Sequence, residues 1–260
     1  MKFKAAVIRD MGLEPPYSVS EPLKIEEVEL SSPQEREVLV QIKAAGLCHS
    51  DLSTVNGNRP RQTPMVLGHE AAGIVMECGS GVADLSQGDH VVLVFAPSCG
   101  ECISCIEGHP GRCEPGQKAN ADGTLLGGGI RLSQNGKKVY HHVGVSAFAE
   151  YCVVNRGSLV KIDKGLPLDE AALFGCAVLT GVGAALNTGE VFPGAKVAVV
   201  GLGGVGLNAL LGARVAGASK IVAIDVHESK LAIAKELGAT DVVNALDEDA
   251  VERVKEMTEG

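Results

Sequence analysis

The 260-residue sequence lacks tryptophan, and aromatic residues make up only 3% of it. A hydrophobic core must therefore be built from Val, Ile, Leu and Ala. Basic residues are also in deficit, because 23 Lys and Arg stand against 32 Asp and Glu, for a formal net charge of −9. Phosphate backbones and anionic lipids bind positively charged surfaces. This charge therefore argues against nucleic-acid and membrane partners.

An export signal and a long apolar segment are missing as well. The first ten residues, MKFKAAVIRD, show neither the apolar core nor the small-residue cleavage site of a signal peptide. The most apolar stretch, residues 197–213, contains five glycines, whereas a membrane-spanning helix needs about 20 predominantly apolar residues. We therefore expect a cytoplasmic protein.

The chain has an ordinary globular composition and a length that suits two domains. In the first part, short runs rich in Val and Ile alternate with Gly, Pro, Asp or Ser, a pattern typical of an all-β barrel or sandwich. The expected strands cover residues 4–8, 37–44, 72–77, 90–95 and 149–154. Residues 98–142 have the composition of a loop, and residues 168–186 have that of a helix.

From residue 196 onward, apolar strands alternate with helical segments. The expected strands are 196–200, 220–224 and 241–243, and the expected helices are 204–216, 228–237 and 248–257. Such alternation predicts βαβ units and a parallel sheet. We place a first domain at residues 1–165 and a second at 166–260.

Four of the eight cysteines lie within 15 residues, as Cys99, Cys102, Cys105 and Cys113. Thiolates at this spacing can surround a tetrahedral zinc ion and leave no open position, which indicates a structural site. A ferredoxin-type iron–sulfur run has a shorter last spacing, followed by proline. Disulfides are disfavoured because no export signal is present. Cys78 and Cys152 are expected to be small buried hydrophobic residues.

A glycine-rich turn follows the strand at 196–200. Residues 201–206 read GLGGVG and open the next helix, which is the context that a dinucleotide-binding GxGxxG motif requires. Gly201 permits the turn, Gly203 lets a pyrophosphate approach, and Gly206 allows close helix packing. Asp225 lies at the end of the second strand, where a carboxylate accepts ribose hydroxyls and repels a 2′-phosphate. NAD is therefore expected rather than NADP.

The sequence offers no evident structural role for three potential metal ligands, Cys48, His69 and Cys176. Together they could form a Cys2His zinc site with a fourth position open to substrate. Taken singly, each of them is more often a buried thiol or a hydrogen-bonded histidine. The residues alone leave both interpretations open.

Several motifs together resemble the zinc-dependent medium-chain alcohol dehydrogenase family, in particular its horse-liver-like and formaldehyde-dehydrogenase-like branch. The motifs are GLCHSD (46–51), GHEAAG (68–73), GDHVV (88–92), CGECISC (99–105) with Cys113, Cys176, GLGGVG (201–206), and the segments at 122–124 and 141–148. The resemblance covers the whole chain. It implies an α/β-plus-β fold, with a GroES-like β-barrel domain followed by a partial Rossmann domain.

The resemblance also implies roles for individual residues. Cys48, His69 and Cys176 would bind a catalytic zinc, with Glu70 behind the ion, and the four-cysteine cluster would bind a structural zinc. Ser50 would accept the alcohol proton and pass it to the cofactor ribose. Further implied roles are a pyrophosphate contact for His49, a hydrogen bond to His69 for Asp51, nicotinamide contacts for Thr180 and Val205, and a substrate-pocket position for Phe95.

Two departures from the family pattern stand out. Many relatives carry a histidine at the position of Ser53, at the end of the proton relay, so proton release would pass through water, the ribose or His49. The chain also ends after three parallel strands, before the second half of a dinucleotide-binding sheet. We interpret it as a C-terminally truncated member of a family whose full-length members form homo-oligomers. The first strand should then have an open edge.

The leading functional hypothesis is an alcohol dehydrogenase that uses two zinc ions per chain and NAD to oxidise a primary or secondary alcohol. The first alternative is a thiol-dependent formaldehyde dehydrogenase of the same branch. The second is an inactive, zinc-stabilised fragment, and the third is a zinc-stabilised binding module. The last is disfavoured by the negative charge and by the dispersed basic residues around the four-cysteine cluster.

Overall fold

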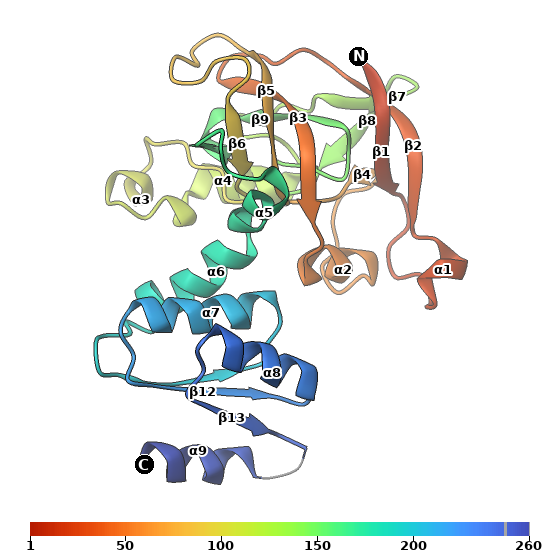
Figure 1. The fold of residues 1–260 in the computed structure, drawn as a ribbon. Helices are drawn as coiled ribbons and strands as arrows, with labels where there is room; N and C mark the ends of the chain where they lie inside the picture. The colour runs from red at the N-terminus through yellow and green to blue at the C-terminus, as the bar shows by residue number, and fades with distance from the viewer. Residues whose placement is uncertain (247–248, 260) are drawn as a thin grey trace. The chain divides into compact units, whose positions relative to one another are not determined.

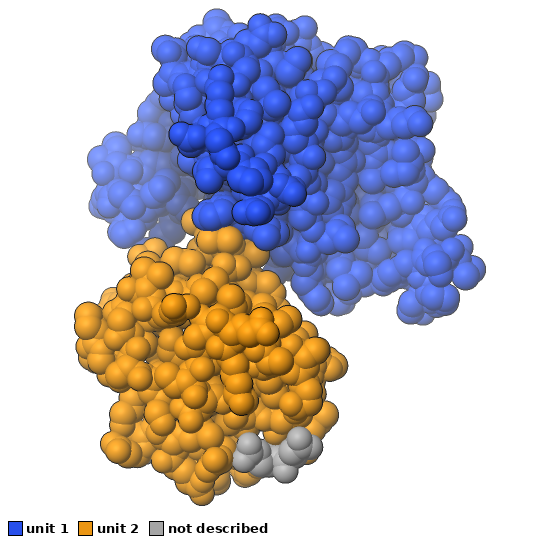
Figure 2. Space-filling view, viewed as in Figure 1, with its two compact units in different colours: residues 1–176 blue, residues 177–260 orange. Residues whose placement is uncertain are grey.

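The computed structural model describes residues 1–246 and 249–259 (Figure 1). The chain forms two compact units, residues 1–176 and residues 177–260 (Figure 2). The expected domain boundary after residue 165 stays a prediction. The segment between the two positions comprises α5 (Leu168–Ala171) and the 3-10 helix η3 (Ala172–Gly175), which pack on the sheet of the first unit.

The first unit contains a closed barrel. Its strands, in spatial order, are β1 (Lys2–Ile8), β2 (Leu23–Leu30), β7 (Leu132–Gln134), β8 (Lys137–His141) and β4 (Met65–Val66). β1 and β2 pair antiparallel from Lys2 opposite Glu29 to Ile8 opposite Leu23. The buried core of this region consists of Val, Leu and Ala side chains together with Phe3, one of the few aromatic residues.

A five-stranded antiparallel sheet packs within the same unit. Its spatial order is β10 (Leu159–Ile162), β6 (His90–Leu93), β5 (Glu70–Cys78), β3 (Glu37–Gly46) and β9 (Tyr151–Asn155). A buried ion pair ties the start of β3 to the loop before β7: Arg131 donates to Glu37 through Nε at 2.7 Å and Nη2 at 2.9 Å. Bidentate pairs of this kind combine strength with fixed orientation.

Short helices connect the strands of this unit. They are α1 (Tyr17–Ser20), α2 (His49–Val55), α3 (Ile103–Ile106), η1 (Pro110–Arg112), α4 (Glu114–Asp122) and η2 (Arg156–Ser158). The expectation that residues 98–142 form a loop is wrong in part, because α4, β7 and β8 lie there. Cys113 caps α4 by accepting a hydrogen bond from Gly116, and a two-residue turn connects β7 to β8.

The second unit is a three-stranded parallel sheet with helices. Its elements are α6 (Ala177–Gly183), the π-helix η4 (Ala184–Thr188), β11 (Lys196–Val200), α7 (Gly204–Val215), β12 (Lys220–Asp225), α8 (Glu228–Leu237), β13 (Asp241–Asn244) and α9 (Ala250–Thr258). The spatial order β11-β12-β13 leaves β11 with one partner among the described residues. This matches the expected open edge, and the Val200 side chain at the end of β11 is 79% exposed.

The expected alternation of strands and helices in the second unit is confirmed, and so are the five expected strands of the first unit. Residue 248, the first of the expected helix 248–257, lies outside the described residues. The expected helix at 168–186 is interrupted, because the backbone at Cys176 leaves the helical region (φ −142°, ψ −69°). The sequence pattern missed β2, whose exposed Lys and Glu side chains mask the buried Val28 and Leu30. Its outward face lies in solvent.

Within the described residues, no single helix has the length and apolar character needed to cross a membrane. One bent pair of helices, Leu168–Gly175 and Ala177–Thr188, meets the criterion by length and composition only.

His141, at the end of β8, makes stability depend on pH. Its side chain is fully buried, and its Nε2 accepts a hydrogen bond from the backbone N–H of Arg131 at 3.1 Å. Burial, aided by the Arg131 charge, lowers the pKa of His141 to about 3. The unfolded chain, with an ordinary pKa near 6.5, therefore binds a proton that the folded chain excludes between these two values.

We accordingly expect neutral His141 to contribute its full share of the free energy of unfolding above about pH 6.5. This stabilisation should be lost as the pH falls, at up to ~1.4 kcal/mol per pH unit. Urea unfolding of the wild type and of His141→Phe at a series of pH values tests it. The variant should be less stable at neutral pH but should show a shallower decline. Parallel curves for the two proteins would contradict the assignment.

Candidate metal centres and dinucleotide-binding loop

The four clustered cysteines converge at one point. The Sγ atoms of Cys99, Cys102, Cys105 and Cys113 all lie within 4.8 Å of one another, and those of Cys99 and Cys105 are 4.0 Å apart. Two sulfurs bound to one tetrahedral zinc at ~2.3 Å would be ~3.8 Å apart. All eight cysteines are free thiols, so no disulfide accounts for the cluster. The residues therefore fit a zinc ion.

Backbone amides surround these sulfurs. Cys99 Sγ accepts hydrogen bonds from the N–H groups of Glu101 (3.4 Å) and Cys102 (3.3 Å), which lower the pKa of Cys99 to about 7. Burial, together with hydrogen bonds to neighbouring thiols, raises the pKa of Cys105 to about 11. Four thiols this close cannot all ionise without a cation, and a divalent metal supplies that charge.

Cys48, His69 and Cys176 form a second convergent group, although 128 residues separate the two cysteines. Their ligand atoms lie within 4.8 Å of one another, and the two sulfurs are 3.8 Å apart, the tetrahedral spacing for zinc. Cys48 precedes α2, His69 precedes β5, and Cys176 occupies the break after η3. Three ligands of this type fit a zinc ion that keeps one position for substrate.

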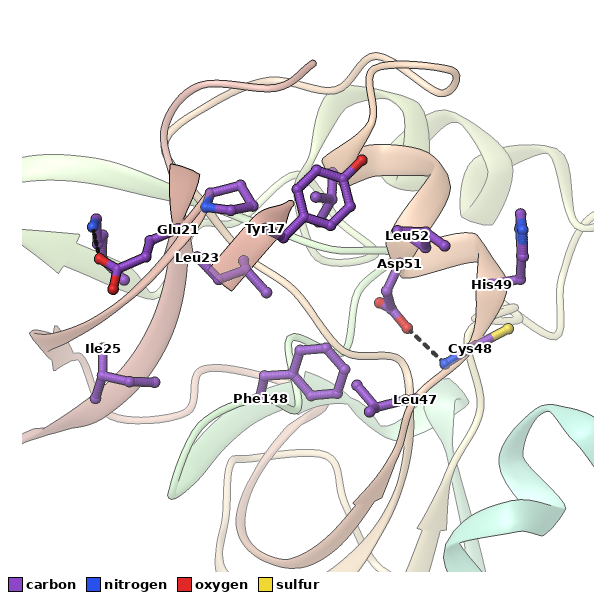
Figure 3. Close-up of a pocket in the computed structure, with 13 residues that line it drawn as sticks. Tyr17, Glu21, Leu23, Ile25, Leu47, Cys48, His49, Asp51, Leu52 and Phe148 are labelled. Atoms are coloured by element: carbon purple, nitrogen blue, oxygen red, sulfur yellow. Dashed lines mark hydrogen bonds and ion pairs between the residues drawn. The ribbon is translucent and has the colours of Figure 1, made fainter. Parts of the chain in front are cut away.

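Asp51 supports this group from within α2. Its carboxylate accepts the Cys48 N–H at 3.3 Å, shown as a dashed line in Figure 3, and lies 3.2 Å from His69 Nδ1. Burial alone would raise the pKa of Asp51, but hydrogen bonds from His142 and His69 hold it well below its ordinary value. Burial likewise opposes the charged form of His69, yet Asp51 and Cys176 raise the pKa of His69 to about 10. The imidazole thus has fixed partners on both ring nitrogens.

The other residues expected near the metal lie in the same region. Glu70 is buried, and its carboxylate lies over Gly46, where a Cβ would approach it to 2.9 Å. Ser50 Oγ is half-buried and accepts a hydrogen bond from Arg59 Nη1 at 3.4 Å. Phe95 contacts the His69 ring edge-on, with ring centroids 5.7 Å apart. The structure therefore places Glu70, Ser50 and Phe95 close to the candidate zinc ligands or on α2.

Ser53, which the sequence analysis places at the end of the expected proton relay, contacts His49. Its hydroxyl donates to the His49 carbonyl at 3.0 Å and lies 3.3 Å from His49 Nδ1. A hydroxyl has one proton, so Ser53 can donate to the carbonyl or to Nδ1 but not to both. The His49 side chain is exposed to solvent.

An apolar pocket with a volume of about 780 Å³ lies beside α2 (Figure 3). Its lining is Tyr17, Glu21, Pro22, Leu23, Lys24, Ile25, Leu47, Cys48, His49, Asp51, Leu52, Val55 and Phe148. Of the three candidate zinc ligands, Cys48 alone contributes to this lining, and Phe95 does not. The pocket therefore borders the metal group only at Cys48, and the expected role of Phe95 in binding substrate stays a prediction.

In the second unit, the GLGGVG segment forms the turn from β11 into α7. Gly201 has φ +84°, a left-handed conformation that glycine adopts without cost. At Gly206, a Cβ would lie 1.8 Å from the Gly201 carbonyl oxygen, so any other residue would force the turn apart. A Cβ at Gly203 would meet nothing within 4 Å. The start of α7 is therefore accessible, and its free N–H groups suit a phosphate.

Asp225 holds this turn in place. Its carboxylate accepts the N–H groups of Leu202 (2.7 Å), Val226 (2.8 Å) and His227 (3.1 Å), and Lys230 Nζ lies 3.6 Å away. The Leu202 N–H contributes most to lowering the pKa of Asp225. The carboxylate therefore stays charged. It fixes the glycine-rich turn through Leu202. The ribose contact that the sequence predicts would be a second role.

Thr180 and Val205 lie in the same neighbourhood. A Cβ at Gly181, next to Thr180, would be 2.3 Å from the Val205 carbonyl oxygen, so α6 packs directly on the start of α7. Thr180 is exposed and Val205 is 41% exposed, which leaves both side chains accessible. Their nicotinamide contacts stay a prediction.

The sequence analysis missed His142. Its Nδ1 lies 3.3 Å from Asp51 Oδ1, and its ring contacts the His69 ring edge-on at 5.4 Å. Asp51, His69 and His142 also form a group of potential metal ligands. Burial lowers the pKa of His142, so its imidazole is neutral. No spacing rule singles it out, because only the fold brings β8 to α2.

Comparisons with known proteins agree with this geometry. The alcohol dehydrogenase GroES-like domain family matches residues 34–164, and the zinc-binding dehydrogenase family matches residues 204–260. A Synechocystis S-(hydroxymethyl)glutathione dehydrogenase is 43% identical over 250 residues, which are 96% of this chain and 66% of that relative. The chain thus spans slightly less than two thirds of the length of this curated relative.

Two solved structures are similar over the whole chain. An alcohol dehydrogenase zinc-binding domain protein from Burkholderia ambifaria has a TM-score of 0.92, and a benzyl alcohol dehydrogenase from Acinetobacter calcoaceticus has one of 0.90. Each is 37% identical to this chain, which covers 68% of either structure. Both similarities include the barrel, the five-stranded sheet and the parallel sheet.

Proposed function

The chain belongs to the zinc-binding alcohol dehydrogenase family, and from this premise we propose that it oxidises a primary or secondary alcohol to an aldehyde or ketone with hydride transfer to NAD. The observation that carries the proposal is the 3.8 Å separation of Cys48 and Cys176 beside His69. A four-cysteine structural centre and a dinucleotide loop in the same chain support it.

Zinc bound by Cys48, His69 and Cys176 would supply a Lewis acid that stabilises negative charge on an alcohol oxygen. Ser50 Oγ would accept the alcohol proton and pass its own hydroxyl proton to the cofactor ribose, while Arg59 keeps that hydroxyl oriented. The proton would then leave the ribose through His49 or water and reach solvent. Glu70 would lie behind the ion, and Phe95 beside the substrate.

The glycine-rich turn and Asp225 would orient the cofactor. The start of α7 would bind the pyrophosphate and Asp225 the ribose, and Thr180 and Val205 would contact the nicotinamide. The substrate would be a small alcohol or aldehyde. We further propose a cytoplasmic location and a homo-oligomeric state.

A second candidate is the oxidation of an S-hydroxymethyl thiol adduct. The similarity to the Synechocystis enzyme supports it. The exposed Arg59 guanidinium supports it further, because it stands beside Ser50 and forms no ion pair with another residue of 1–246 and 249–259. A free cation at this position would suit a substrate that carries a carboxylate, as glutathione adducts do.

An assay of the zinc-loaded chain tests both candidates. NADH formation would be followed by absorbance with benzyl alcohol, with a short secondary alcohol, and with formaldehyde plus glutathione. We expect turnover with NAD and much less with NADP, because Asp225 repels a 2′-phosphate. Chelation should abolish the activity, and added zinc should restore it.

The same assay separates the candidates. A preference for the glutathione adduct would support the thiol-dependent reaction, and a preference for benzyl alcohol would support the leading proposal. Two bound zinc ions without turnover on any substrate would instead identify a zinc-stabilised, inactive chain.

A further inference from the structure

The Asp51 carboxylate is contacted from four directions, and one of these contacts has no role in the mechanism above. Asp51 Oδ2 accepts the Cys48 N–H at 3.3 Å, while Oδ1 accepts the Gly68 N–H at 3.1 Å and lies 3.2 Å from His69 Nδ1. The fourth neighbour is His142 Nδ1, at 3.3 Å from Oδ1. The Asp51 and His142 side chains are 5% and 3% exposed, so both groups are buried.

His142 begins a strained turn. Its N–H donates to Ser146 Oγ at 2.9 Å, and its carbonyl accepts the Val145 N–H at 3.0 Å. Within this turn, Val143 has φ +45° and Ser146 has φ +59°. The left-handed region is costly for a β-branched residue and persists only where the surroundings impose it. The strain therefore points to a function for the side chain that this turn directs inward.

The turn is attached to the segment that carries His69. The N–H of Ala147 donates to the Gly68 carbonyl at 2.9 Å, and the N–H of Phe148 donates to the Leu67 carbonyl at 2.9 Å. The His142 and His69 rings meet edge-on at 76°. Both imidazoles are thus fixed by one backbone arrangement around the same carboxylate oxygen.

We propose that His142 is a positioning residue of the zinc site, which holds the Asp51 carboxylate in the orientation that aims His69 at the metal. His142 Nδ1 lies 3.3 Å from Asp51 Oδ1 but makes no hydrogen bond of good geometry with it or with any other residue described, so the contact is a close electrostatic one. Partners behind a ligating histidine fix its ring, and their loss typically costs about 10–100-fold in metal affinity. The inference rests on the proposed function, because it takes Cys48, His69 and Cys176 as the zinc ligands.

The same three side chains could in principle bind a metal of their own, since ligand atoms of Asp51, His69 and His142 lie within 4.8 Å of one another. In that reading an ion would lie between His69 Nδ1 and Asp51 Oδ1, which are 3.2 Å apart, and would replace their direct contact. The metal content of the chain distinguishes the two readings. Two zinc ions per chain agree with a positioning role, and three would contradict it.

The experiment compares His142→Phe with His142→Asn in the full chain. Phenylalanine keeps the ring volume but removes the donor, whereas the asparagine amide nitrogen can take the place of Nδ1. His90→Phe is the matched control, because His90 on β6 belongs to neither metal group. Zinc affinity would be measured by competition with a chelator. The four-cysteine site in the same molecule serves as an internal reference.

We expect His142→Phe to bind zinc at the Cys48 site roughly tenfold more weakly, and His142→Asn to stay within about twofold of the wild type. The four-cysteine site and the His90→Phe protein should be unchanged. Cobalt(II) at the Cys48 site should show altered absorption bands in His142→Phe only. Unchanged affinity and unchanged cobalt bands in His142→Phe would overturn the proposal.

A double-mutant cycle guards against a purely structural effect. If His142 acts through Asp51, His142→Phe should add little to the loss caused by Asp51→Asn, whereas additive losses would contradict the proposal. Should His142→Phe fail to fold, His142→Gln replaces it, because its longer amide reaches the position of Nε2 and should bind zinc more weakly than His142→Asn. A wild-type chain without zinc at Cys48 would refute the proposed function itself.

Discussion

Replacing Cys48 by serine should remove one of two zinc ions and abolish alcohol oxidation. Zinc affinity at that site should fall by more than the ~10–100-fold that changing an outer partner typically costs. Serine is chosen because Cys48 is also the N-cap of α2, where its side chain accepts from the backbone N–H of Asp51. Serine is a favoured N-cap, so the helix should persist while the soft thiolate is lost. The variant therefore separates the metal from the fold.

Metal analysis and the NADH assay provide the measurements for Cys48→Ser. Cys78→Ser is the matched control, because Cys78 is a half-buried free thiol outside both metal groups. The control should retain two zinc ions and full activity. If Cys48→Ser also retains two zinc ions, the assignment of the Cys2His site is wrong.

Replacing Cys113 by serine should have the largest effect on stability. Zinc binding contributes an apparent ~10–16 kcal/mol in small zinc domains, much of which is free energy of folding. Cys113 is buried, caps α4 by accepting the Gly116 N–H, and lies within 4.8 Å of three other thiols. Serine can keep the cap but not the zinc. We therefore expect residues 99–122 to unfold locally and the melting temperature to fall by many degrees.

Limited proteolysis and metal analysis test this second prediction. New cleavage sites should appear between residues 99 and 122, and one zinc ion should be lost. A smaller loss of zinc binding is expected at the site of Cys48, His69 and Cys176. The reason is that Asn120 on α4 donates to the Phe95 carbonyl at 2.8 Å, and Phe95 packs on His69. Unchanged proteolysis of Cys113→Ser would show that the cluster has no structural metal.

Local sequence patterns were sufficient wherever the partners are neighbours in the chain. The spacing of Cys99, Cys102, Cys105 and Cys113 specifies one ion, because short loops bring their sulfurs together. Likewise, the strand, glycine turn and helix around residues 201–206 follow from local backbone requirements. The same reasoning missed β2 and the elements of 98–142, because an exposed strand face and a capped helix leave a weak hydrophobic pattern.

The sequence by itself thus determined the four-cysteine centre, the βαβ alternation and, through family resemblance, the identity of Cys48, His69 and Cys176 as a set. Only the tertiary structure decided that the sulfurs of Cys48 and Cys176 lie 3.8 Å apart and that His142 meets Asp51. The physical reason is that such contacts depend on strand pairing and on the break in the helix at Cys176. These long-range features leave no periodic signal in the residues that they bring together.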